Sequence, residues 1–243
     1  MTARRTQPVG DLLAGAPLDI IKTVAVAAMV LDHVNKTLLH YCFDTMWLVG
    51  RLAFPLFTFA IAAHLVRGAQ PGPYVQRLVV LAVISQPGFA IGFATSDPNT
   101  VFTLAAGAAI AALLRGQKPL VQHAVFAVGV GAIFTPWLRT RTGLDFGLAG
   151  ILLPAGLAMG LDMGREARPA LAAWLVPLFV GLALYPNAPL ALELGGLLII
   201  LVGGSATLWL ALRFRGRGRF LPRYAFYAFY PVHLLLLASA RAL

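Results

Sequence analysis

The chain has 243 residues, of which 59% are hydrophobic and 12% charged, and its mean hydropathy is +0.81. A water-soluble domain carries about 25% charged residues, so this composition excludes a soluble globular protein and predicts a helical membrane protein. The net charge of +10 does not indicate nucleic-acid binding, because the basic residues lie between apolar segments in a pattern that orients a membrane protein. We therefore expect membrane lipid, and no nucleic acid, among the partners.

Nine apolar segments follow one another, with short connections rich in Gly, Pro, Asp and Asn between them. They are long and do not alternate in polarity, which disfavours transmembrane strands. The expected spans are residues 18–41, 46–66, 77–94, 100–115, 119–138, 145–162, 170–186, 189–212 and 224–241. The sequence predicts an all-α transmembrane bundle of about nine spans, a single domain over 1–243 in which 1–16 is a polar N-terminal tail without a signal peptide.

The basic residues predict how this bundle is oriented. With the N-terminus in the cytoplasm, most lysines and arginines between spans fall on the cytoplasmic side, and Arg139, Arg141 and Arg241 fall on the other. This bias predicts an N-in, C-out topology, in the inner membrane of a bacterium. The basic stretch 213–223 has two interpretations, an anchor on anionic lipid or a phosphate-binding loop.

The first span carries a polar face. On a helix, Lys22 and His33 differ by about 20° around the axis and by about 16 Å along it, and Lys36, Thr37 and His40 continue that face outward. Ionisable residues at membrane depth cost roughly 2.5–3.5 kcal/mol each, which makes them a functional hypothesis by default. His33 can serve as a general base near neutral pH, or it can simply form a hydrogen bond to a neighbouring helix.

Asp32 and Arg51 are the next candidates. Arg51 lies early in the second span, close to the depth of Asp32, so we predict an ion pair between them that either staples the two helices or positions an active site. Pro55 is expected to kink the second span.

A second histidine, His233, is expected at the depth of His33, and two histidines at one depth can flank a substrate or a water molecule. His233 or Tyr230 is a candidate donor to a developing oxyanion. No third ligand of matching depth is evident, so a metal site is not expected.

Polar residues also gather at the two membrane faces. The outer group predicts an acceptor site, although Asn99 and Asp145 can equally be helix N-caps. It consists of Asn99, Thr103, Arg139, Arg141 and Asp145. The inner group suits the phosphates of a cofactor that enters from the cytoplasm, or serves as a topology signal alone. It consists of Arg67, Arg77, Arg115 and Lys118.

Several motifs resemble the TraX family of integral membrane proteins, in the expected order over most of the chain. They are Leu18–Lys22 with Met29–His33, Gly50–Phe57, Tyr74–Leu78 with Ile84–Pro87, Phe102–Gly107, Leu144–Gly147 and Phe226–Leu234. The resemblance is weakest between residues 155 and 220. The family is named for a protein that N-acetylates conjugative pilin, and it is similar to a wider class of transmembrane acyltransferases. That class carries a basic residue ten intervening positions before a histidine in its first helix, the spacing of Lys22 and His33 here, with lysine where arginine is common.

The resemblance implies a membrane-embedded acetyltransferase. Acetyl-CoA would enter from the cytoplasm, with Lys22 toward its phosphates and His33 as the general base, and an acceptor amine or hydroxyl of a pilin-like protein, glycan or other envelope component would approach from the periplasm. Two functions of other classes stay open. One is a proton-coupled transporter or flippase, since membrane-embedded Asp and His also form proton relays, and the other is a non-catalytic envelope scaffold.

Overall fold

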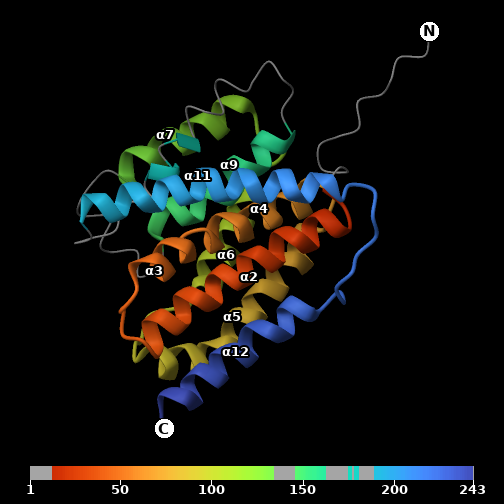
Figure 1. Cartoon of the computed structure of the whole chain (residues 1–243). Helices are drawn as coiled ribbons and strands as arrows, with labels where there is room; N and C mark the ends of the chain where they lie inside the picture. The colour runs from red at the N-terminus through yellow and green to blue at the C-terminus, as the bar shows by residue number, and fades with distance from the viewer. Residues whose placement is uncertain (1–12, 134–145, 163–174, 177, 181–188, 243) are drawn as a thin grey trace.

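The computed structural model describes residues 13–133, 146–162, 175–176, 178–180 and 189–242. In these ranges the regular structure is helical, and the helices cross and pack as a bundle (Figure 1). The elements are α2 (Ala16–Thr37), α3 (Asp44–Gly50), α4 (Ala53–Val66), α5 (Pro71–Phe93), α6 (Thr100–Leu114), α7 (Pro119–Ile133), α9 (Gly147–Asp162), α11 (Leu190–Arg213) and α12 (Ala225–Arg241).

The predicted apolar segments agree with these helices, with two differences. The expected segment 46–66 is divided into α3 and α4, and the expected segment 170–186 lies mostly outside the described residues. By length and composition, three described stretches are able to cross a membrane: Asp44–Val66, Pro71–Phe93 and Leu190–Arg213. Three shorter helices, α6, α7 and α9, are also apolar.

The division between α3 and α4 has a local cause. Pro55 is the third residue of α4, and a proline lacks the N–H that would bond the carbonyl four residues earlier, which here is that of Arg51. The chain therefore forms a turn of 3₁₀ type at this point. The N–H groups of Arg51 and Leu52 donate to the carbonyls three residues earlier, those of Leu48 and Val49, at 3.1 Å each. Pro55 was expected to kink one continuous helix, but in the structure it lies in the first turn of a new one, where it is well tolerated.

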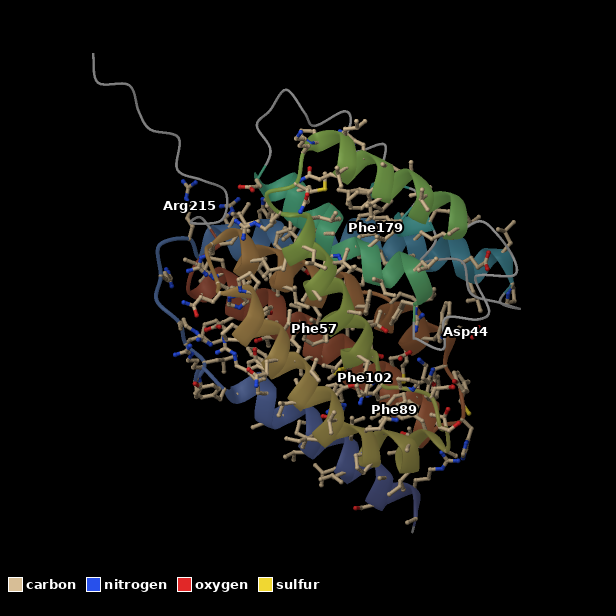
Figure 2. All side chains as sticks on the ribbon, turned by 180° about the vertical axis from the view of Figure 1, so that it is seen from behind. Asp44, Phe57, Phe89, Phe102, Phe179 and Arg215 are labelled. Carbon is tan, nitrogen blue, oxygen red and sulfur yellow. The ribbon has the colours of Figure 1, made fainter. Side chains whose placement is uncertain are left out.

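The described helices surround α2 and α4. One arc, α12–α5–α6–α9, packs consecutively around them, α7 packs on α9, and α11 packs on the other side of α2 (Figure 1). The loops define two ends, which we name by the lysines of α2. At the Lys22 end α4 ends, α5 begins and the 214–224 loop lies, and at the Lys36 end α3 and α6 begin. Arg215 and Asp44 mark the two ends on opposite sides of Figure 2.

The outward faces of the outer helices are apolar. On α5, α11 and α12, many large aliphatic and aromatic side chains are 40–65% exposed. They include Val79, Val80, Val83, Ile84 and Ile91 on α5, Leu194, Leu198, Leu201, Val202 and Trp209 on α11, and Val232, Leu235 and Leu236 on α12. Apolar surface on this scale belongs in lipid, so the chain is a membrane protein. In contrast, α2 carries its polar residues because it lies inside the bundle, against protein.

Glycines allow close helix crossings at two places. Gly88 of α5 faces Leu234 of α12, where an added Cβ would lie 3.2 Å from the Leu234 Cβ. Gly107 of α6 faces α9, where an added Cβ would lie 2.7 Å from the Cγ of Pro154 and 2.9 Å from the carbonyl oxygen of Ile151. At Gly107 neither neighbour can move aside for an added Cβ, because one is a proline ring and the other is helix backbone.

We therefore expect Gly107→Ala to destabilise the protein by about 1–3 kcal/mol, the usual cost of overpacking. Gly72→Ala in the first turn of α5 is the control, because none of the described atoms lies within 4 Å of the added Cβ. Thermal unfolding in detergent measures both. Equal melting temperatures for the two variants would show that the α6–α9 crossing is not as tight as described.

Candidate functional site

Two histidines from α2 and α12 form a hydrogen-bonded pair inside the bundle. His33 Nδ1 lies 3.0 Å from His233 Nε2, and both side chains are buried. The ring centroids are 5.2 Å apart and the ring planes differ by only 16°. The distance between the ring centroids exceeds the distance between the two nitrogens by roughly the sum of the radii of two imidazole rings. The rings therefore meet edge to edge, and the proton that they share lies between the two nitrogens. The sequence suggested that the two histidines could flank a substrate or a water molecule. In the structure they contact each other directly.

The backbone of α12 determines which nitrogens carry protons. His233 Nδ1 lies 3.3 Å from the carbonyl oxygen of Phe229, which can only accept, so this nitrogen is the donor. In the neutral ring, His233 Nε2 is then the acceptor, and His33 Nδ1 must donate to it. His33 Nε2 is left with a free lone pair. The two hydrogen bonds thus leave His33 in the tautomer that a base requires.

Aromatic rings enclose this pair. Phe93 meets the His33 ring edge-on at 4.9 Å, Phe229 stacks on His233 at 5.1 Å, and Tyr230 lies 5.3 Å from His233. In the described ranges no three His, Cys, Asp or Glu side chains converge as metal ligands do. The pair lies nearer the Lys36 end than was expected of a mid-depth site, since His33 is four residues before the end of α2.

Asp32 shares its carboxylate between two cations. Lys36 Nζ lies 2.7 Å from one oxygen and Arg51 Nη2 lies 3.7 Å from the other, so the predicted Asp32–Arg51 ion pair is confirmed. Gly50 packs so closely on the Asp32 side chain that a Cβ there would overlap it. The Arg51 guanidinium also lies 4.7 Å from the Trp47 ring centroid.

The expected outward continuation of the polar face is confirmed for Lys36, which lines the same cavity as Lys22 and His33, and is wrong for His40. Lys36 turns to Asp32, and Thr37 donates a hydrogen bond of 2.7 Å to the His33 carbonyl. His40 lies beyond the last residue of α2.

At the other end of α2, Lys22 has a partner that the sequence did not suggest. Its Nζ lies 2.9 Å from Nε2 of His64, near the end of α4. Phe226 lies below the ammonium at 5.6 Å, and the Tyr74 ring is 5.7 Å from the His64 ring. Lys22 is therefore held in place by two other helices rather than free to move.

A cavity of about 1000 Å³ connects these groups. It lies between α2 and α4 on one side and α5, α6, α9 and α12 on the other, with Phe57 and Phe89 (Figure 2) among its apolar lining. Its polar lining spans both ends of the bundle. At the Lys22 end these residues are Lys22, His64, Tyr74, Arg77, Arg219, Arg223 and Tyr227, and towards the Lys36 end they are Asp32, His33, Lys36, Arg51, Asp97 and Tyr230.

Several predicted site residues lie outside this lining. The Arg115 guanidinium donates to the Leu65 carbonyl at the end of α4, Arg67 is the residue after α4, and Lys118 precedes α7. The structure thus brings Lys22 and Arg77 to the cavity and leaves the other three inner basic residues away from it.

The predicted acceptor residues are also distributed differently. Asn99 and Thr103 are fully buried and do not line the cavity. The side chain of Asn99 caps α6 by accepting from Val101 N at 3.0 Å and donates to the Ala82 carbonyl, so its N-cap interpretation is confirmed. Arg139, Arg141 and Asp145 lie outside the described residues.

The Asp32 cluster yields a prediction about stability. Asp32→Asn leaves two cations, Lys36 and Arg51, close together without their carboxylate, which we expect to cost about 3 kcal/mol. Asp44→Asn, an exposed carboxylate at the start of α3, should cost almost nothing. Thermal unfolding in detergent compares them, and a melting temperature of Asp32→Asn equal to that of Asp44→Asn would contradict the proposed energetic role of the cluster.

Comparison with known proteins identifies the family. The TraX protein family profile matches residues 17–241. The probable fimbrial assembly protein FimC, serogroup H1, of Dichelobacter nodosus is 27% identical over 91% of this chain and 94% of its own length. Protein TraX of Escherichia coli is 30% identical over 90% of this chain and 85% of its own length, and the TraX of strain K12 is 34% identical over 64% and 61%. No solved structure matches the chain significantly. With nearly its whole length matched in order, the chain belongs to the TraX family.

Proposed function

We propose that this protein is a membrane-embedded acetyltransferase that moves an acetyl group from acetyl-CoA to an amine or hydroxyl acceptor. The observation that carries the proposal is the cavity that joins the basic Lys22 end to His33, whose Nε2 the two hydrogen bonds leave as the acceptor nitrogen. The names of the relatives, TraX and a fimbrial assembly protein, favour a pilin-like protein or another envelope component as the acceptor.

The donor suits the dimensions of the cavity. Lys22 and His33 are separated by about 16 Å along α2. The pantetheine arm of CoA has about 13 chain bonds between phosphorus and sulfur, which span roughly 15 Å at the extension of an extended polypeptide. Phosphates bound near Lys22 and Arg77 would therefore bring the thioester near His33. The apolar lining between them matches the largely uncharged arm.

The chemistry at His33 follows from its tautomer. The acceptor N–H or O–H gives its proton to His33 Nε2 while its heavy atom forms a bond to the acetyl carbonyl carbon. The C–S bond then breaks, and the imidazolium gives the proton to the departing CoA thiolate, which leaves as the thiol and returns His33 to its neutral form. His233 stabilises the imidazolium through Nδ1–H of His33, and the Phe229 carbonyl orients His233 in turn. A positioned base of this kind contributes typically 10²–10⁴-fold. Tyr230, which lines the cavity and lies beside His233, stays our candidate donor to the oxyanion.

The orientation follows from charge. The Lys22 end carries Arg67, Arg77, Arg115 and Lys118 together with the basic 214–224 loop, and we assign it to the cytoplasm, where acetyl-CoA is available. The Lys36 end then faces the periplasm and receives the acceptor. About nine spans with the N-terminus inside and the C-terminus outside fit this assignment, in the inner membrane of a bacterium.

Loss of the base should remove most of the activity. We expect His33→Ala to lower the transfer of labelled acetyl groups by 10²–10⁴-fold. We expect His233→Asn, which can still accept from His33 but cannot share charge, to lower it less. Transfer by the purified protein to a surrogate amine measures both. Wild-type rates in His33→Ala would remove this histidine from the mechanism.

Donor binding should depend on the basic residues at the cavity and not on those outside it. We expect Lys22→Ala and Arg77→Ala to weaken CoA binding by about tenfold each, the usual effect of losing a charge-assisted hydrogen bond. Lys118→Ala is the matched control. Stabilisation of the purified protein by CoA measures the affinity. A transporter with the same cavity would show no stabilisation by CoA, and equal losses in all three variants would reflect net charge alone.

A further inference from the structure

The 214–224 loop, which joins α11 to α12, is fastened to the first turn of α2. The N–H of Ala16 donates to the Arg217 carbonyl at 3.1 Å, and Gly15 at φ 75° packs directly on that carbonyl. Most of the loop's side chains are exposed, so apolar burial contributes little to its position. Specific polar contacts therefore hold it.

Asp19 supplies the central contact. It is only 1% exposed, and one carboxylate oxygen accepts the N–H groups of Phe220 and Leu221 at 3.1 and 3.2 Å. The other oxygen lies 3.4 Å from Nη2 of Arg219. A buried carboxylate that accepts two backbone N–H groups and pairs with an arginine fixes both the path of the chain and the direction of that arginine.

The Asp19 contact determines where the basic side chains lie at the Lys22 end of the cavity, which we call the cavity mouth. Arg219 and Arg223 line the cavity, beside Lys22, which lies one turn after Asp19 on α2. Aromatic rings surround the same place: Phe226 under Lys22, and Tyr224 beside Arg223 at 5.6 Å. Without Asp19 the loop would keep its Ala16–Arg217 contact but lose the contacts that fix residues 219–221, and Arg219 would be free to turn into solvent.

We infer that Asp19 is a positioning residue, which holds the 214–224 loop across the cavity mouth so that Arg219 and Arg223 face the phosphates of a CoA-type acyl donor. The inference rests on the proposed function and adds to it two donor-binding arginines and the residue that orients them. Asp19 acts through the loop and does not itself touch the donor, because its carboxylate is already used by Phe220, Leu221 and Arg219.

Two variants and their combination test this inference. Asp19→Asn keeps an oxygen that can accept from the loop backbone but removes the ion pair, and Arg219→Gln removes the other partner at a 40% exposed site where unfolding is not expected. Asp44→Asn is the control for loss of a carboxylate elsewhere. CoA affinity by thermal stabilisation and the KM and kcat for acetyl-CoA are measured for wild type and these four variants, with the acceptor saturating.

We expect Asp19→Asn and Arg219→Gln each to raise the Kd for CoA and the KM for acetyl-CoA by about tenfold, with kcat changed by less than about twofold. Asp44→Asn should match wild type. Because Asp19 acts through Arg219, the double variant should be little worse than Arg219→Gln alone.

Other outcomes overturn the inference in distinguishable ways. If wild type binds CoA and Asp19→Asn binds it equally well, the inference fails and the proposed function stands. If the two single effects multiply in the double variant, Asp19 does not act through Arg219. If wild type neither binds CoA nor transfers acetyl groups, the proposed function fails, and the donor-binding role of the loop fails with it.

Discussion

Each ionisable side chain on α2 needs a partner inside the protein, because lipid outside the bundle offers none. Four of them obtain one from a different part of the chain. Asp19 binds the 214–224 loop, Lys22 contacts His64 of α4, Asp32 pairs with Arg51 between α3 and α4, and His33 contacts His233 of α12. These contacts fasten α2 to its surroundings along its whole length, and Lys22, Asp32 and His33 among them line the cavity that we propose to be the path of the acyl donor.

This arrangement explains why polar groups that are costly in a membrane are present together. A lone buried histidine is explained by one hydrogen bond to a neighbour. Here the neighbour of His33 is itself fixed by the Phe229 carbonyl, and the two bonds leave a lone pair on the ring that lines the cavity. Asp32 lies directly before His33 on α2, and its ion pairs with Lys36 and Arg51 stabilise the helix that carries His33. In our account it supports the site rather than takes part in the chemistry.

Most of the fold was predictable from the sequence, because long apolar segments and turn residues define helices without reference to the rest of the chain. The break at Arg51 was not predicted, although Pro55 was its signal. The Asp32–Arg51 pair was predicted because both charges lie near one end of adjacent spans. The Lys36–Asp32 pair was missed, although the spacing of four residues was visible in the sequence. His64 and Asp19 were missed for a physical reason: their partners lie 42 and about 200 residues away, and only the packing register brings them together.

The central claim is that one cavity brings a donor thioester to His33 from the basic end of the bundle. The most direct test is an experimental density map of the protein with CoA bound. The account predicts nucleotide phosphates beside Lys22 and Arg219, a pantetheine arm between α2, α4 and α5, and the sulfur in contact with His33. Density for CoA elsewhere, or a His33 ring sealed among apolar side chains with no opening to the cavity, would contradict it.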